Sequence, residues 1–198
     1  MTSSTTMQVT YPHSLSANFT SETMLIRDVQ AEDFEQIQAI YAYHVLHSTA
    51  TFEEVPPSIT EMRHRYDDIQ QAGLPYLVAV LNEQIVGYAY AGLYRSRAAY
   101  RFTLEDSIYL ARGQIGKGLG KALLKELLVR CEQGPWRQMI AVIAGHDKHE
   151  SIGLHRALGF VHAGTQVATG YKFQQWIDVV FMQRALGAGN STPPTPED

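Results

Sequence analysis

The sequence predicts one α/β domain whose mixed, mostly antiparallel sheet contains one parallel pair and is flanked by helices. Two pairs of strand-like segments read as antiparallel hairpins, one in the middle of the chain and one near its end. Between them follow a strand, a glycine cluster, a helix and another strand, and such a crossover makes two strands parallel. The 198 residues, 45% of them hydrophobic, suffice for one core.

The first half of the domain is read from periodicity and turn residues. A short strand is expected at 24–27, and apolar residues near helical spacing predict a helix over 31–47. After a loop at 48–58, a second helix over 59–71 stops before Gly73 and Pro75. Strands at 76–81 and 84–93 then form a hairpin around the turn 82–83.

The second half contains the crossover and the last hairpin. A strand at 107–110 leads into the glycine cluster, a helix follows over 119–133, and a buried strand is expected at 138–144. A helix over 151–158 ends at Gly159, and strands at 161–169 and 175–183 close the domain. Composition divides the chain into a disordered leader, 1–22, the folded domain, 23–186, and a disordered tail, 187–198.

Composition also excludes several classes of function. The net charge of −4 comes without a basic stripe, so no nucleic-acid partner is expected. No stretch approaches the ~20 apolar residues of a membrane span, and the N-terminus lacks the apolar core of a secretory signal. The single cysteine, Cys131, cannot form an intramolecular disulfide and lies in an apolar helical run. We therefore expect a cytoplasmic protein in which Cys131 is packed rather than catalytic.

The most informative segment is the glycine loop, residues 115–121 (IGKGLGK), between a strand and a helix. Glycines let the backbone approach a ligand, and the first turn of the helix exposes unpaired N–H groups at its positive end. Lys117 and Lys121 add positive charge, so the segment predicts a phosphate site. The alternative is a tight strand-to-helix turn without a ligand.

Two common phosphate motifs do not fit this loop. The dinucleotide pattern G-x-G-x-x-G requires a glycine at its sixth position. Counted from Gly116 that position is Lys121, and counted from Gly118 it is Leu123. The P-loop requires Ser or Thr after its lysine, but Ala122 follows Lys121.

The loop resembles instead the acetyl-CoA loop of the GNAT N-acetyltransferases, Gln/Arg-x-x-Gly-x-Gly/Ala. Gly118 and Gly120 occupy its two small positions, whereas Ile115 stands where Gln or Arg is usual. Five further segments, in the same order, resemble the phosphinothricin and methionine sulfoximine acetyltransferase branch, so the resemblance covers nearly all of 24–186. These segments are 48–53 (STATFE), 90–100 (YAGLYRSRAAY), 103–110 (TLEDSIYL), 154–160 (LHRALGF) and 170–178 (GYKFQQWID).

The resemblance implies the GNAT fold and transfer of an acetyl group from acetyl-CoA to the α-amine of a small amino-acid-like acceptor. Glu105 aligns with the family's general base, which accepts the proton of the amine. From composition alone, Glu105 and Asp106 would be read as solvated acids at a strand entrance. His155 stands where many members carry a tyrosine acid, and its alternative role is packing or capping.

Acetyl-CoA is the expected co-substrate, with no metal. Backbone N–H groups around Tyr109 or Leu110 would stabilise the thioester oxygen. Lys148 stands where asparagine is usual in the family, near Ser151. The implied contacts to acetyl-CoA are Tyr109, Leu110, Ile115, Gly116, Lys117, Gly118, Leu119, Gly120, Lys121, Lys148 and Ser151.

On the acceptor side, the resemblance implies Phe52 and Tyr100 as pocket walls. Arg95 and Arg97 share a face in an extended segment, and arginine forks bind carboxylates or phosphinates. The alternative is two surface arginines. The natural acceptor stays open, because phosphinothricin is a xenobiotic-like compound.

Two other functions remain open at this point. One is a GNAT enzyme for a polyamine, an aminoglycoside or a protein N-terminus, although Arg95 and Arg97 count against a cationic acceptor. The other is a non-catalytic protein that binds acetyl-CoA, which Ile115 and Lys148 favour and Glu105 disfavours.

The resemblance further implies a homodimer. Aromatic residues in the last hairpin are either its contact or ordinary strand residues: Tyr171, Phe173 and Trp176. The run 146–150 (HDKHE) is read as a solvated loop rather than a metal site.

Overall fold

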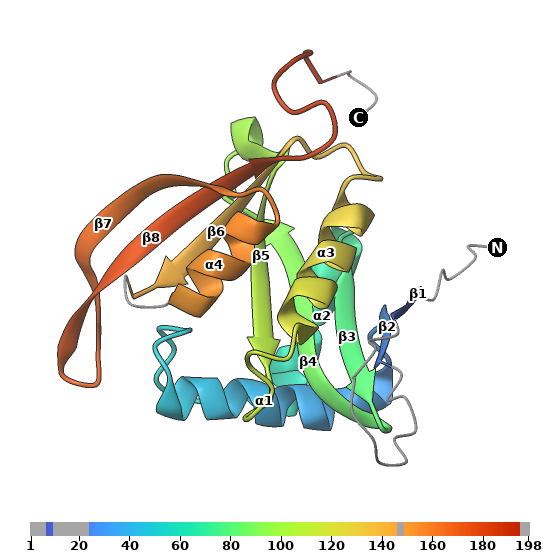
Figure 1. The fold of residues 1–198 in the computed structure, drawn as a ribbon, viewed down its shortest axis with the longest axis vertical. Coiled ribbons are helices and arrows are strands. Elements are labelled where there is room, and N and C mark those ends of the chain that lie inside the picture. The colour runs from blue at the N-terminus through green and yellow to red at the C-terminus, as the bar shows by residue number, and fades with distance from the viewer. Residues whose placement is uncertain (1–6, 10–23, 146–148, 195–198) are drawn as a thin grey trace, which may run out of the picture.

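The computed structural model describes residues 7–9, 24–145 and 149–194. Within these residues, eight strands form one sheet in the order β1-β2-β3-β4-β5-β6-β8-β7 (Figure 1). Of the described neighbours only β5 and β6 run parallel, which confirms the predicted mixed, mostly antiparallel sheet. The strands are Met7–Val9 (β1), Met24–Asp28 (β2), Tyr76–Leu81 (β3), Gln84–Leu93 (β4), Thr103–Leu110 (β5), Gln138–Ala144 (β6), Val161–Lys172 (β7) and Gln175–Ala185 (β8).

Helices cover both faces of the sheet. Side chains of β3 alternate between them: Tyr76 and Val78 pack with α1 and α2, whereas Leu77 and Ala79 pack with α3. Helix α4 lies on the same face as α3 (Figure 1). The helices are Phe34–His47 (α1), Ile59–Gln71 (α2), Leu119–Cys131 (α3) and His149–Ala157 (α4), and Ala31–Asp33 (η1) and Ala98–Tyr100 (η2) are short 3-10 turns.

Local sequence signals explain several boundaries. The Ser58 hydroxyl accepts the Glu61 N–H at 3.1 Å and caps α2. Gly73 takes a φ of +69° just after α2. Asn82 and Glu83 adopt φ angles of 50° and 62°, the left-handed pair that a two-residue hairpin turn requires. The predicted helix end and the predicted hairpin are therefore confirmed.

Three expectations need correction. Met7–Val9, inside the predicted leader, pairs antiparallel with β2, because an open sheet edge accepts a short extended segment whatever its composition. Strand β5 begins at Thr103 rather than at residue 107, because both β4 and β6 pair with its first half. Part of the predicted tail forms turns, with a hydrogen bond from Ser191 N–H to Ala188 O at 3.0 Å.

The parallel pair β5–β6 separates part-way along its length, which leaves one edge of β5 uncovered. Its register runs only from Thr103↔Gln138 to Asp106↔Ala141, although both strands continue beyond these residues. The other edge of β5 stays paired with β4 up to Gly87↔Leu110. From Ser107 to Leu110, β5 therefore has one edge that β6 does not cover. An extended ligand can add to such an edge.

Candidate active site

Two neighbouring acids, Glu105 and Asp106, stand where β5 and β6 cease to pair. Successive side chains of a strand point to opposite faces. Asp106 lies on the α4 side, against His155, so Glu105 points to the face covered by α1 and α2. The two carboxylates thus have different surroundings despite their adjacency.

Glu105 is a half-buried carboxyl with a raised pKa. Burial is the main cause, the charge of Asp106 adds to it, and the charge of Arg95 opposes it. A higher pKa makes the carboxylate a stronger proton acceptor at neutral pH. The position therefore suits a general base.

Asp106 and His155 form a buried pair between β5 and α4. His155 is 2% exposed, its Nε2 lies 3.0 Å from Asp106 Oδ2, and its Nδ1 lies 2.7 Å from Ser151 O. Burial disfavours the charged ring, but the hydrogen bonds and the charge of Asp106 outweigh it and raise the pKa of His155. An imidazolium donating from both nitrogens satisfies both acceptors. Both nitrogens of His155 are therefore occupied by acceptors of the protein itself.

The glycine loop leads into α3 with an open N-terminus. Gly116 and Gly118 take φ angles of +82° and +79°, which favour glycine, and no side chain caps α3 at Gly118. A Cβ at Gly120 would lie 3.5 Å from side-chain atoms of Leu110 and Leu154. The uncapped N–H groups of α3 therefore stand beside the carboxyl end of β5 and beside α4.

The side chains around this loop differ in orientation. Ile115 is 61% exposed, and Lys121 is also exposed at the start of α3. Lys117 Nζ donates to Gln114 Oε1 at 3.2 Å. Leu119 is buried in the core under α3. The loop thus presents backbone N–H groups and two lysines to an anion, and Ile115 contributes no polar contact.

Backbone alternation identifies the groups on the uncovered edge of β5. Ala111 N–H donates to Val86 O and Tyr94 N–H to Thr103 O, so odd-numbered residues of β5 bond to β4. The N–H of Tyr109 therefore points to β4, and its ring lies 5.0 Å from that of Tyr41. Leu110 N–H points to the uncovered edge, while Leu110 O accepts a hydrogen bond from His44 Nε2 at 2.8 Å.

The predicted acceptor residues divide between the two ends of β5. Arg95, Arg97 and Tyr100 lie exposed in the segment before β5, where the Tyr94 ring is 4.7 Å from the Arg95 guanidinium. Phe52 lies in the loop after α1, with its ring against Gly170 of β7. Arg95 influences Glu105 electrostatically. The structure thus places Arg95 within electrostatic reach of Glu105, and Phe52 near the carboxyl end of β5, where Tyr41 contacts both Thr51 and Tyr109.

The comparison with family models decides the classification. Residues 26–181 match the family described as acetyltransferase (GNAT) domain. The chain belongs to the GNAT acetyltransferase family.

Similar proteins agree with this assignment. The chain is 54% identical over 169 residues to the phosphinothricin N-acetyltransferase of Alcaligenes faecalis, covering 85% of this chain and 86% of that one. It is 37% identical to the L-methionine sulfoximine/L-methionine sulfone acetyltransferase of Pseudomonas aeruginosa, with 85% and 98% covered. A phosphinothricin acetyltransferase from Sinorhizobium meliloti, solved with acetyl-CoA, superposes with a TM-score of 0.84 at 51% identity, with 86% and 92% covered.

This GNAT acetyltransferase is an acetyl-CoA-dependent enzyme, and its residues fit that substrate. The uncapped start of α3, with Lys117 and Lys121, suits a pyrophosphate. The uncovered edge of β5 suits an extended amide-bearing arm. Ser151 contributes its carbonyl to His155, and Lys148 lies outside the described residues.

The acetyltransferase also contains polar residues near the site that sequence reasoning missed. Lys172 is 2% exposed, and Glu53 is held by Arg65 and Tyr41. Each contact joins segments at least 12 residues apart, so no local spacing reveals it. The one signal was that Glu53 and Lys172 lie in two of the family-like segments, 48–53 and 170–178, which does not reveal their contacts.

Two features are absent from the part of the chain that the structure describes. No helix among them is long and apolar enough to cross a membrane. The same residues contain no group of three His, Cys, Asp or Glu side chains arranged to hold a metal ion.

Proposed function

We propose that this acetyltransferase transfers the acetyl group of acetyl-CoA to the α-amine of a small amino acid with an anionic or strongly polar second end. The observation that carries this proposal is the position of Glu105, half-buried where β5 and β6 cease to pair, with Arg95 nearby. The similar proteins that act on phosphinothricin or methionine sulfoximine support the acceptor class.

In the proposed mechanism, Glu105 removes a proton from the acceptor's ammonium group, directly or through one water. The free amine then attacks the thioester carbonyl, so that an N–C bond forms, the nitrogen releases its second proton to solvent, and the C–S bond breaks. Leu110 N–H, on the uncovered edge of β5, donates to the carbonyl oxygen as it gains negative charge. The thiolate takes its proton from solvent, because both nitrogens of His155 are occupied.

The glycine loop supplies the binding energy for acetyl-CoA in this proposal. The first N–H groups of α3 and the charges of Lys117 and Lys121 hold the pyrophosphate. Arg95 and Arg97 bind the acidic groups of the acceptor, because guanidinium forks match carboxylate and phosphinate oxygens. Tyr100 and Phe52 form walls of the acceptor site.

The acceptor class is tested by thiol release from acetyl-CoA with three amines: phosphinothricin, methionine sulfoximine and spermidine. We expect turnover with the two amino acids and little with the polyamine, because two arginines repel a cation. Preferred turnover of spermidine would overturn the acceptor class. Binding of acetyl-CoA without turnover of any amine would favour a non-catalytic protein.

We also propose that the enzyme is a homodimer. Apolar side chains stand exposed on the β7–β8 hairpin: Trp176 is 68% exposed and Tyr171 55%, with their rings 5.0 Å apart. Exposed aromatic groups of this kind are typical of interfaces. Light scattering during size-exclusion chromatography tests this, and a monomer at micromolar concentration would contradict it.

A further inference from the structure

The loop between α1 and α2, residues 48–58, is held to the rest of the protein from two sides. We call it the wall loop, because it contains Phe52. On one side Lys172, 2% exposed, donates from Nζ to Ser48 O at 2.9 Å and to Thr51 O at 2.7 Å. A buried ammonium needs such partners. The amino half of the wall loop is thereby fixed to β7.

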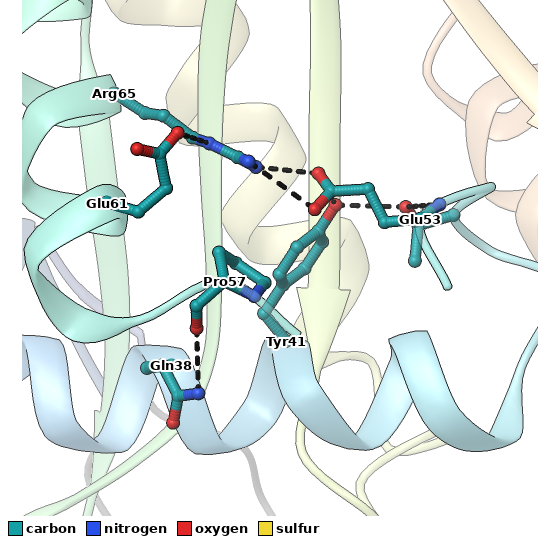
Figure 2. Close-up of polar contacts among 7 residues, drawn as sticks. Gln38, Tyr41, Glu53, Pro57, Glu61 and Arg65 are labelled. Atoms are coloured by element: carbon teal, nitrogen blue, oxygen red, sulfur yellow. Dashed lines mark hydrogen bonds and ion pairs between the residues drawn. The ribbon is translucent and has the colours of Figure 1, made fainter. Parts of the chain in front are cut away.

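On the other side, Arg65 of α2 forms an ion pair with Glu53. Arg65 Nη1 lies 2.6 Å from Glu53 Oε1, and Nη2 lies 3.4 Å from Oε2 (Figure 2). The hydroxyl of Tyr41, from α1, donates to the same Oε1 at 2.8 Å. Arg65 Nε also bonds Glu61 Oε1 at 2.9 Å, within its own helix. Glu53 therefore joins the wall loop to both helices.

Phe52 stands between these two attachments. Its neighbours in sequence are Thr51, held through its carbonyl by Lys172, and Glu53, held by Arg65. Its ring lies so close to Gly170 that a Cβ there would collide with it. The glycine is needed for this close approach. The position of the Phe52 ring is thus determined from three directions.

The wall loop borders the carboxyl end of β5. Tyr41, which holds Glu53, also packs its ring against Tyr109 at 5.0 Å. His44, four residues before the loop begins, lies 2.8 Å from Leu110 O through its Nε2. Burial is the main cause of the raised pKa of Tyr90 and Tyr109, and the charge of Glu53 adds a smaller contribution to both. The loop is therefore close to the edge on which the acetyl group would be presented.

We propose that Arg65 and Lys172 clamp the wall loop so that Phe52 forms a fixed wall of the acceptor site, which makes Arg65 a positioning residue for the acceptor. This inference rests on the proposed function, because the role of Phe52 toward an acceptor depends on the proposed acetyl transfer. Exposed ion pairs contribute little to global stability, and Arg65 and Glu53 are 41% and 35% exposed. The clamp is accordingly expected to act on local order and acceptor binding rather than on folding.

The kinetic test compares three variants of the full chain with phosphinothricin as acceptor. In Arg65→Met we expect the acceptor KM to rise about tenfold, with kcat and the KM for acetyl-CoA changed by less than about twofold. Arg65→Lys, which can still pair with Glu53, should recover most of this loss. Glu61→Gln removes only the negative charge that Arg65 meets within α2 and should leave the acceptor KM unchanged.

A second measurement keeps the test independent of activity. Amide hydrogen exchange in peptides spanning 48–58 should speed up in Arg65→Met and stay as in the wild type in Glu61→Gln. Unchanged exchange and an unchanged acceptor KM in Arg65→Met would overturn the inference, as would an equal loss in all kinetic constants. If the wild type acetylates none of the acceptors, the proposed function fails and the role toward the acceptor fails with it. In that case faster exchange in Arg65→Met would still support the clamp itself.

Discussion

Asp106 Oδ2 and His155 Nε2 lie 3.0 Å apart in a buried pair that ties β5 to α4. The pair stands one residue from Glu105 and at the last register position before β5 and β6 cease to pair. It fixes the strand at the point where the proposed chemistry occurs. Its effects on stability and on pH dependence separate a structural role for His155 from a catalytic one.

Removing the acid of this pair should destabilise the fold. In Asp106→Ala, His155 keeps its burial but loses its charged partner, and we expect a loss of about 3–5 kcal/mol in the free energy of unfolding. Urea denaturation measures this loss. The control Asp68→Ala removes an exposed carboxylate 3.9 Å from His64 and should change stability by less than about 0.5 kcal/mol. Equal effects of the two variants would contradict the structural role of the pair.

The raised pKa of His155 predicts a pH dependence of stability. Because its pKa in the folded protein lies above the ordinary 6.5, its contribution is complete below that pH and is lost as pH rises through the folded pKa. Urea titrations from about pH 6 to pH 9 should show this decline in the wild type, and the decline should be smaller in His155→Gln. An unchanged decline of stability with pH in His155→Gln would show that groups other than His155 cause the decline.

The fold was largely predictable from local patterns, because hairpins and amphipathic helices leave signals in short windows. The turn at Asn82 and Glu83 and strands β3, β4 and β6 have the expected bounds. The first half of β5 was missed because Glu105 and Asp106 interrupt its apolar pattern. Its pairing with β4 and β6 overrides that local signal.

The site was predictable only where residues act through a motif. The glycine loop carries its chemistry in consecutive residues, so sequence alone indicated a phosphate site. The contacts of Glu53 with Arg65 and of Lys172 with Thr51 depend on tertiary structure and leave no local signal. The burial of His155 likewise depends on where α4 packs, so its role could not be read from spacing.

The two glycines of the acetyl-CoA motif should respond differently to substitution. Gly118 has a φ of +79°, so Gly118→Ala strains the loop by about 1–2 kcal/mol and should raise the KM for acetyl-CoA. A Cβ at Gly120 meets Leu110 and Leu154 at 3.5 Å, an ordinary contact, so Gly120→Ala should have a smaller effect. Steady-state kinetics at saturating acceptor measures both. A larger effect in Gly120→Ala would contradict this account of the loop.

Arg95 should influence both acceptor binding and the pH profile. Its charge lowers the pKa of Glu105, so Arg95→Leu should shift the acidic limb of the kcat/KM profile to higher pH and raise the acceptor KM. Arg101→Leu is the matched control, because Arg101 stacks over Phe102 and bonds Ala98 O instead. An unshifted acidic limb in Arg95→Leu would show that Arg95 does not influence the pKa of the general base.

The central claim is that Glu105 acts as the general base, and the Glu105→Gln variant tests it most directly. Thiol release with phosphinothricin and calorimetric binding of acetyl-CoA would be measured in parallel, with Glu35→Gln, an exposed acid on α1, as control. We predict that kcat falls by about a hundredfold or more while acetyl-CoA binds with unchanged affinity. Turnover within about tenfold of the wild type would contradict the claim, because a lost general base removes more than that.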